Sequence, residues 1–302
     1  MSELANMVDS LRLKIFNDST INLNTSGTSG QSKIVKKNAR EIFDKCKRSA
    51  EYDSSDIFGF LYNLETWAAV SVVLYCIKNN IKPYRINLDL PLHAQLLEVS
   101  LLSITPTFLK LISMNLEGKK IKNIKKVILG GEYSDQDTIN LCKSLFPNSR
   151  IITIYSSTET GDIATSSDMI EGFSKKKFKD YSFDNNGCLI KEGVNTGDVW
   201  KLCGERYRFV GRIDSCIKIA GNLVSINSLE KKIKNLATID DCVCQVLDAP
   251  VIGKSYKLLY VGELTKEAVR SELKTLLKKY EMPVLIKKVE NIGFGKNFKK
   301  NR

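Results

Sequence analysis

The chain has 302 residues, which is enough for one large domain and a second, smaller one. Hydrophobic residues make up 43% and charged residues 26%, so the composition excludes a disordered chain. The formal net charge of +12 would suit a nucleic acid, an anionic membrane surface or an acidic partner. The lysines are spread along the chain without an aromatic-plus-basic nucleic-acid module, so we expect a solvated lysine-rich surface and no nucleic-acid partner.

The N-terminal segment and the cysteines indicate a cytoplasmic protein. Residues 1–16 carry charges throughout and lack the apolar run of a signal peptide. The longest nearly apolar stretch, residues 67–77, is too short to span a bilayer. The eight cysteines contain no Cys-x-x-Cys pair and the chain has a single histidine, which disfavours a zinc site and predicts reduced thiols.

Strand-length apolar runs alternate with helical patterns through the first two thirds of the chain. The patterns predict strands over 57–62, 84–86, 101–105, 126–129 and 150–155, and helices over 65–78, 106–112 and 135–145. Such alternation is typical of an α/β domain with helices packed on a mainly parallel sheet. Ligands of these sheets bind at the carboxyl ends of the strands, where three polar turns of this chain fall.

The pattern changes after residue 181. Short strands are predicted over 188–190, 199–202 and 207–210, after a turn at Asn185-Asn186-Gly187. A compact α+β unit follows, with strands over 213–219, 242–247, 258–261 and 284–289 and helices over 225–235 and 266–280. We place the boundary near Arg212, which divides the chain into a core domain of residues 1–211 and a small domain of residues 212–302.

A run of small hydroxylic residues and glycines precedes the first strand and ends in a lysine. It consists of Thr25, Ser26, Gly27, Thr28, Ser29, Gly30, Gln31, Ser32 and Lys33. Glycines let backbone N–H groups turn inward, and hydroxyls and an ammonium group donate to phosphate oxygens. The run is not a Walker A loop, because Ile34 follows the lysine. A flexible linker has the same composition, so the run alone leaves both interpretations open.

Four further polar segments carry groups that suit a nucleotide. Gly130-Gly131-Glu132 follows a strand and lets the backbone approach a flat ring. Tyr155-Ser156-Ser157-Thr158-Glu159 offers an aromatic face, a hydroxyl for phosphate and a carboxylate for Mg²⁺. Asp198 can accept from ribose hydroxyls, and Arg212 supplies a cation. Each has a structural alternative: Glu159 as a helix-cap partner, Asp198 as a turn residue and Arg212 in a salt bridge.

The joint order of these segments resembles the adenylate-forming superfamily of acyl-CoA synthetases, peptide-synthetase adenylation domains and luciferases. The resemblance runs from Thr25 to the C-terminus. The most specific segment is residues 211–221, Gly-Arg-Ile-Asp-Ser-Cys-Ile-Lys-Ile-Ala-Gly, which is similar to the family's hinge motif. Gly295-Lys296 resembles the motif of its mobile catalytic lysine. The implied fold is a large α/β domain followed by a small, mobile C-terminal α+β domain.

The resemblance implies an AMP-forming acid–thiol ligase, which joins a carboxylic acid to AMP and passes the acyl group to a pantetheine thiol. Residues 25–33 would cradle the leaving phosphates, Glu159 would hold Mg²⁺, and Thr158 would donate to the α-phosphate. Gly130, Gly131, Glu132 and Tyr155 would border the adenine, and Asp198 and Arg212 the ribose. Lys296 would bridge the carboxylate and the α-phosphate, with Lys299 as a rival. The small domain would turn about Asp214, and Gly221 would line the path of the thiol of CoA or of an acidic carrier protein.

The chain departs from the family pattern at several positions. Ser156 occupies a position where the family usually has glycine. Its side chain is expected to narrow the acyl pocket beside Gly130. Asn63 replaces the aspartate that binds the substrate ammonium in amino-acid activators, which favours a small or medium acid without an ammonium group. Leu223 and Ser228 replace the basic and acidic residues usual after the hinge. Only 24 residues precede the phosphate loop, so the resemblance implies N-terminal truncation and a bare face that a second copy or a partner chain would cover.

Two alternatives remain open at this point. The chain could be a nucleotide-binding regulator or scaffold without catalysis, although both Lys33 and Lys296 are retained. It could also adenylate an acid and pass the acyl group to an amine or a hydroxyl.

Overall fold

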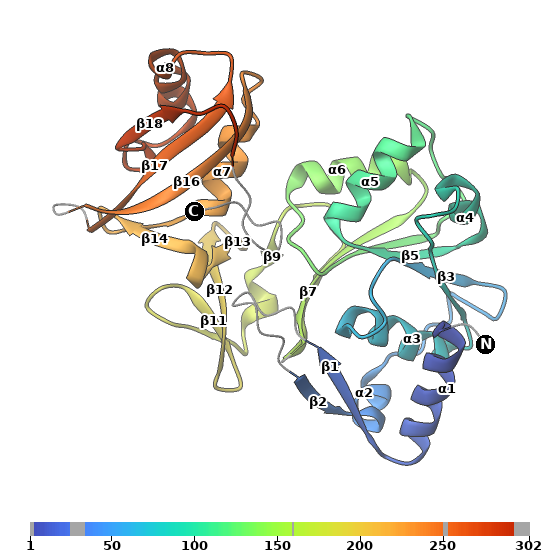
Figure 1. Cartoon of the computed structure of the whole chain (residues 1–302). Helices are drawn as coiled ribbons and strands as arrows, with labels where there is room; N and C mark the ends of the chain where they lie inside the picture. The colour runs from blue at the N-terminus through green and yellow to red at the C-terminus, as the bar shows by residue number, and fades with distance from the viewer. Residues whose placement is uncertain (1–2, 25–33, 159, 250–252, 293–302) are drawn as a thin grey trace. The chain divides into compact units, whose positions relative to one another are not determined.

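The computed structural model describes residues 3–24, 34–158, 160–249 and 253–292. The chain divides into two compact units (Figure 1). The first contains Met1–Asp180 with Gly204–Tyr207, and the second contains Tyr181–Cys203 with Arg208–Arg302. The domain boundary near residue 212 stays a prediction.

A six-stranded sheet organises the first unit. Its order is β4-β3-β5-β6-β7-β8, in which the first five strands are parallel and β8 is antiparallel to β7. The strands are β3 (Ile57–Phe60), β4 (Lys82–Arg85), β5 (Leu101–Ile104), β6 (Lys126–Leu129), β7 (Arg150–Ser157) and β8 (Gly161–Ser166). The mainly parallel α/β sheet predicted from the alternating pattern is confirmed.

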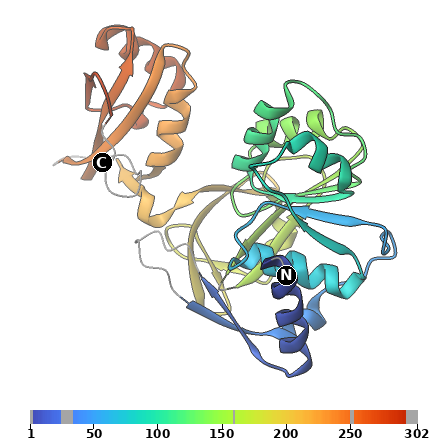
Figure 2. The same ribbon diagram turned by 45° about the vertical axis from the view of Figure 1, so that its right-hand side comes forward.

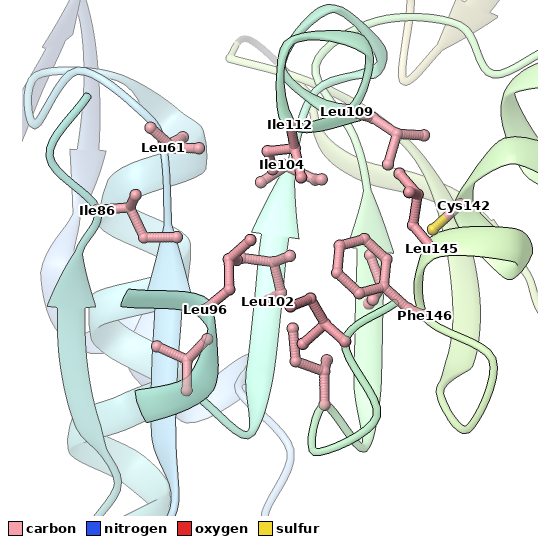
Figure 3. Close-up of a cluster of buried hydrophobic side chains, with 14 of the residues drawn as sticks. Leu61, Ile86, Leu96, Leu102, Ile104, Leu109, Ile112, Cys142, Leu145 and Phe146 are labelled. Carbon is pink, nitrogen blue, oxygen red and sulfur yellow. The ribbon is translucent and has the colours of Figure 1, made fainter. Parts of the chain in front are cut away.

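Three helices pack on one face of this sheet: α4 (Leu92–Glu98), α5 (Pro106–Leu116) and α6 (Gln136–Leu145). Figure 3 shows their apolar side chains meeting those of the strands and of the segments that follow β3 and β4. Strand residues alternate between the faces, so Leu102 and Ile104 of β5 point into this cluster while Leu101 points to the other side. Pro106 begins α5 after the cap residue Thr105, as the sequence predicts.

The opposite face is covered by α1 (Glu3–Phe16), α2 (Ala39–Lys45) and α3 (Trp67–Asn79). Helix α3 is the most apolar of the three and buries six side chains, from Ala69 to Cys76. Helices α1 and α3 lie side by side in both views (Figures 1 and 2). A two-stranded antiparallel ribbon, β1 (Thr20–Asn24) and β2 (Ile34–Asn38), adds Ile21 and Leu23 to the same core.

Short elements complete the first unit and begin the second. Strand β9 (Phe173–Ser174) pairs with Tyr207 and Arg206, and the 3₁₀ helix η1 (Lys175–Phe178) follows it. In the second unit β10 (Ser182–Phe183), β11 (Cys188–Lys191) and β12 (Val194–Cys203) form an antiparallel sheet. The later part of β13 (Arg206–Arg212) lies next to β12 in this sheet.

The C-terminal part of the second unit is a separate sheet with two helices. The sheet contains β14 (Cys216–Ile219), β15 (Asn222–Ser225), β16 (Ile239–Ala249), β17 (Gly253–Gly262) and β18 (Leu285–Lys288). Helices α7 (Ile226–Lys234) and α8 (Lys266–Leu276) bury their apolar stripes against it. The largest buried side chains here are Tyr256 and Tyr260, whose hydroxyls donate to the carbonyls of Glu281 and Leu264.

Several predicted boundaries are wrong, among them those near β14, α8 and β7. Residues 213–215 form the 3₁₀ helix η2 and the strand begins at Cys216. Helix α8 ends at Leu276, and a 3₁₀ turn over Lys279–Glu281 replaces its predicted last turn. Strand β7 continues to Ser157 rather than 155, because the antiparallel neighbour β8 supplies pairing partners beyond the parallel part of the sheet.

Candidate functional site

The carboxyl ends of β3, β5, β6 and β7 lie at one edge of the sheet, because the four strands are parallel neighbours. Asn63 follows β3, Gly130–Glu132 follow β6, and Thr158 follows β7. Sequence-predicted residues from three separate segments are therefore brought to this edge. We call it the carboxyl edge.

Gly130 and Gly131 turn the chain directly after β6. The amide of Gly130 donates to the carbonyl of Ile104 at 3.1 Å and extends the pairing with β5. A Cβ atom at Gly130 would lie 2.6 Å from Cγ2 of Ile154, so only glycine lets β6 and β7 pack here. Gly131 has φ +77°, a left-handed conformation that favours glycine. The glycine pair is thus required by the turn itself.

Glu132 is exposed and its carboxylate reaches helix α5. Its Oε2 atom accepts from the backbone N–H of Thr107 at 3.2 Å and from the Thr107 hydroxyl at 2.7 Å. A carboxylate is favoured at this position because the first-turn N–H groups of a helix lack partners and carry partial positive charge. Thr107 is a contact that sequence reasoning missed, although Thr105-Pro106 marks the helix start beside it.

A tight hairpin joins β7 to β8. Tyr155 pairs with Ala164, Ser156 with Asp162 and Ser157 with Gly161. The Ser157 hydroxyl accepts from the amide of Thr160 at 3.0 Å and lies 2.7 Å from the Thr160 hydroxyl. The ring of Tyr155 lies 6.5 Å from that of Phe173, centroid to centroid. Tyr155 and Ser156 are thus strand residues, and Thr158 stands at the hairpin turn.

Asn63 occupies the turn between β3 and α3. Its side-chain oxygen accepts from the amide of Glu65 at 3.2 Å, and its carbonyl accepts from the hydroxyl of Thr66 at 2.7 Å. Thr66 in turn caps α3 by accepting from the amide of Ala69. The exposed Asn63 therefore has a local structural role, and it also lines a cavity of the first unit.

In the second unit Asp198 and Arg212 form an ion pair. Arg212 Nη1 donates to Asp198 Oδ1 at 3.1 Å and to the carbonyl of Thr196 at 2.9 Å. Gly197 has φ +71°, and a Cβ atom there would lie 3.0 Å from Nη2 of Arg212. The glycine therefore leaves the space that the guanidinium fills.

This pair fits a sugar with neighbouring hydroxyls. The Asp198 side chain is 13% exposed and the Arg212 side chain 42%, so both still reach solvent. Arg212 Nε is buried and has no hydrogen-bond partner among the described residues; Asp214 Oδ1 lies 3.9 Å from it. A carboxylate held beside a partly exposed guanidinium is a pair of groups that suits the hydroxyls of a ribose.

Asp214 and Gly221 lie on either side of β14. Asp214 is in η2, directly before the strand. Ala220 and Gly221 form a two-residue turn between β14 and β15 with φ +46° and +79°. A Cβ atom at Gly221 would meet no heavy atom within 4 Å, so the position is open. Their roles as hinge and thiol path stay predictions.

The remaining predicted residues lie outside the described ranges: Thr25, Ser26, Gly27, Thr28, Ser29, Gly30, Lys33, Glu159 and Lys296. Glu159 is the predicted Mg²⁺ ligand. Among the residues that the structure does describe, no group of three His, Cys, Asp or Glu side chains could hold a metal ion. None of the eight cysteines forms a disulfide. Within the same described ranges, every helix is too short or too polar to cross a membrane.

Sequence reasoning also missed a clamp on the segment between β8 and β9. Arg206 donates to both carboxylate oxygens of Asp168, at 2.7 and 3.2 Å, and to the carbonyls of Ile170, Glu171 and Gly172. Tyr133, next to Glu132, donates to Glu171 Oε1 at 3.0 Å. The clamp therefore ties residues 168–172 to the turn after β6. A single arginine in a strand gives no sequence signal for such a role.

The sequence matches no protein-family model and no curated protein sequence. Solved structures are similar in fold. o-Succinylbenzoate CoA synthetase (MenE) from Bacillus subtilis, in complex with the acyl-adenylate intermediate OSB-AMP, superimposes with a TM-score of 0.72 at 15% identity. ATP-bound MatB from Rhodopseudomonas palustris gives 0.69 at 14% identity.

The chain has the fold of these CoA synthetase structures. The superposition covers 92% of this chain but 67% of the MenE chain and 66% of the MatB chain, so the chain spans about two thirds of their length. An acyl-CoA synthetase (AMP-forming)/AMP-acid ligase II-like protein from Dyadobacter fermentans is similar over 98% of this chain and 91% of its own, with a TM-score of 0.53 at 16% identity. The family resemblance drawn from the motifs is confirmed at the level of the fold.

Proposed function

We propose that the protein activates a carboxylic acid with ATP, forming an acyl-adenylate and pyrophosphate, and transfers the acyl group to a pantetheine thiol. The observation that carries the proposal is the corner formed by Gly197, Asp198 and Arg212. It offers a carboxylate beside a partly exposed guanidinium to a ribose, in a chain with the fold of CoA synthetases. The exposed carboxyl edge, with Glu132 and Thr158, supplies the groups proposed for the adenine and the α-phosphate.

The proposed mechanism is positioning and charge neutralisation, because little covalent chemistry falls to the protein in phosphoryl transfer. The acid's carboxylate attacks the α-phosphorus in line and pyrophosphate leaves. Thr158 donates to the α-phosphate, and Asp198 and Arg212 hold the ribose. Lys33 and Lys296 neutralise the phosphates and the attacking carboxylate. Glu159 would hold Mg²⁺, which would supply further positive charge against the leaving group. CoA and an acidic carrier protein both remain candidate acceptors.

Carboxylate-dependent ATP–pyrophosphate exchange tests the proposal. We expect exchange with one class of acid and a loss of about 10²–10³ in rate for Lys296→Ala, because that change removes a charge donor to the transition state. Lys299→Ala is the matched control on the same segment and should retain activity. If Lys299→Ala loses exchange and Lys296→Ala does not, the catalytic lysine is Lys299.

The outcome also separates the rival functions. ATP binding without exchange for any acid would overturn adenylation and favour a non-catalytic nucleotide-binding regulator. Exchange followed by transfer to hydroxylamine but to neither CoA nor a carrier protein would place the acceptor among amines and hydroxyls.

A further inference from the structure

A cavity of about 1270 Å³ lies in the first unit beside the carboxyl edge. Its walls come from helix α1, the turn after β3, the segment of β4 and the residues that follow it, and the start of α5. Ligand cavities of proteins commonly measure about 300–1,000 Å³, so this one is large enough for a sizeable molecule.

The floor of the cavity is apolar and aromatic. It contains the buried Leu61 and Ile86, the half-buried Val8 and Phe108, and the tyrosines at 62 and 84. Leu61 and Ile86 also belong to the hydrophobic cluster of Figure 3. Burying hydrocarbon against such a floor is favourable in proportion to the area removed from water.

The two tyrosines present rings rather than hydroxyls to a ligand. The Tyr62 hydroxyl lies 3.1 Å from Ser103 Oγ, and the Tyr84 hydroxyl donates to Gln95 Oε1 at 3.2 Å. Burial raises the pKa of Tyr62 to about 12, so its phenol is neutral at physiological pH. Because the hydroxyls are already paired, the floor favours an apolar ligand over one with many hydrogen-bonding groups.

Charged side chains stand at the rim. Arg85 Nη1 pairs with Glu3 Oε2 at 3.2 Å, and the two side chains are 42% and 82% exposed. Lys82, Asp9 and Asp89 lie on the same rim. The ionic groups therefore border solvent and leave the floor to the hydrocarbon.

The cavity adjoins the carboxyl edge at two residues. Asn63 lines it, and Phe108 follows Thr107, which hydrogen-bonds to Glu132. Strands β3 and β7 are three steps apart in the sheet, which corresponds to about 14 Å at the usual strand spacing. An acid that reacts near Thr158 and reaches this cavity must therefore carry a long side chain.

We propose that the cavity binds the hydrocarbon tail of the substrate, which makes the substrate a medium- or long-chain carboxylic acid rather than a small one. The proposal rests on the proposed function for the identity of the ligand as a substrate. Asn63 would border the path of the chain, and the rings of Tyr62, Tyr84 and Phe108 would contact it.

Calorimetric titration with sodium butanoate, octanoate and decanoate, without ATP, tests the cavity directly. We expect affinity to rise about fourfold for each added methylene until the cavity is filled. Ala5→Trp and Leu88→Trp introduce bulk at two separate walls. Each should weaken decanoate binding at least tenfold and leave butanoate binding unchanged.

Each variant has a matched control. Leu13, 61% exposed, lies on the same helix as Ala5, and Leu90, 52% exposed, lies two residues from Leu88; neither lines the cavity. Leu13→Trp and Leu90→Trp should bind decanoate within twofold of the unmodified protein. Equal affinity for butanoate and decanoate, or unchanged decanoate binding in both lining variants, would overturn the proposal.

The two proposals fail in different ways. Decanoate binding that depends on the lining residues, without any pyrophosphate exchange, would sink adenylation and leave the cavity as an acyl-binding site. Exchange with short acids only, unaffected by Ala5→Trp and Leu88→Trp, would support adenylation and sink the long-chain substrate.

Discussion

The parallel sheet has an amino edge, where its strands begin, and the carboxyl edge, where they end. The two edges use the same kinds of polar residue differently. At the amino edge Asp56, 2% exposed, accepts from Lys125 Nζ at 2.8 Å and from the amide of Asp53 at 3.1 Å. Asn123 donates to the carbonyls of Leu96, Leu97 and Val99. The Asp56 carboxylate is enclosed and the protein uses both of its oxygens, although Asn123 and Lys125 themselves are exposed.

At the carboxyl edge the polar residues stay accessible. Asn63 and Glu132 are both exposed; Asn63 contacts the nearby start of α3, and Glu132 contacts the start of α5. The chain turns there on glycines and hydroxylic residues. A buried, satisfied carboxylate contributes to stability, whereas an exposed one beside open backbone is available for a ligand.

The largest stability effect is expected at the amino edge. Asp56→Ala leaves the Asp53 amide and the Lys125 ammonium without their acceptor and should lower the free energy of unfolding by about 2–4 kcal/mol. Urea-induced unfolding measures this. Asp53→Ala is the control, since the exposed Asp53 carboxylate accepts only from Ser55. Equal losses in the two variants would contradict the contrast between the edges.

The Asp56 carboxylate also makes the stability of the folded state depend on pH. Burial raises the pKa of Asp56, but hydrogen bonds from Lys125, Ser100 and the Asp53 amide outweigh it and hold the pKa below its usual value of 3.8. A depressed pKa stabilises the folded state above about pH 4, and that contribution is lost as pH falls through the folded-state pKa. Asp56→Asn should therefore flatten the fall in stability below about pH 4.

In the second unit, two glycines of one hairpin both have positive φ but differ in their surroundings. Gly197 (φ +71°) faces Arg212, whereas a Cβ atom at Gly193 (φ +78°) would meet no heavy atom within 4 Å. Both changes to Ala should cost about 1–2 kcal/mol of stability, because the left-handed conformation is strained with a side chain. Gly197→Ala should also weaken AMP binding about tenfold, by displacing the guanidinium.

Calorimetric titration of AMP into both folded variants tests whether the guanidinium helps to hold the nucleotide. Gly193→Ala controls for backbone strain and should keep the affinity of the unmodified protein. If Gly197→Ala binds AMP equally well, the corner at Asp198 does not hold the ribose.

The sequence predicts the sheet well because each strand is short, apolar and bounded by polar turns. Strand 126–129 matches β6 residue for residue, since Gly130 ends it. Helix α1 escapes prediction, because only Leu11 is fully buried and its apolar pattern is weak. The short strand β8 also escapes, since its place depends on pairing with β7 rather than on its own residues.

The candidate site, like the fold, is only partly predictable from the sequence. The order of motifs indicates Asp198 and Arg212 as a functional pair, and the geometry brings them to 3.1 Å. The contacts of Glu132 with Thr107 and of Arg206 with Asp168 cross between segments far apart in the chain. Such contacts depend on side-chain directions in the folded chain, which residue spacing does not contain. The cavity beside α1 is hidden from the sequence for the same reason.

The smallest expected effect concerns Glu132, which tests the carboxyl edge itself. Glu132→Gln removes a charge from the N-terminal turn of α5 and should cost about 0.5–1 kcal/mol of stability. Thr107→Val removes the 2.7 Å hydroxyl contact from the other side and leaves the carboxylate in place. If Glu132 only caps the helix, both variants should bind ATP like the unmodified protein in a calorimetric titration. If Glu132→Gln alone weakens ATP binding, the carboxylate contacts the nucleotide, and the exposed edge differs from the enclosed one in function as well as in structure.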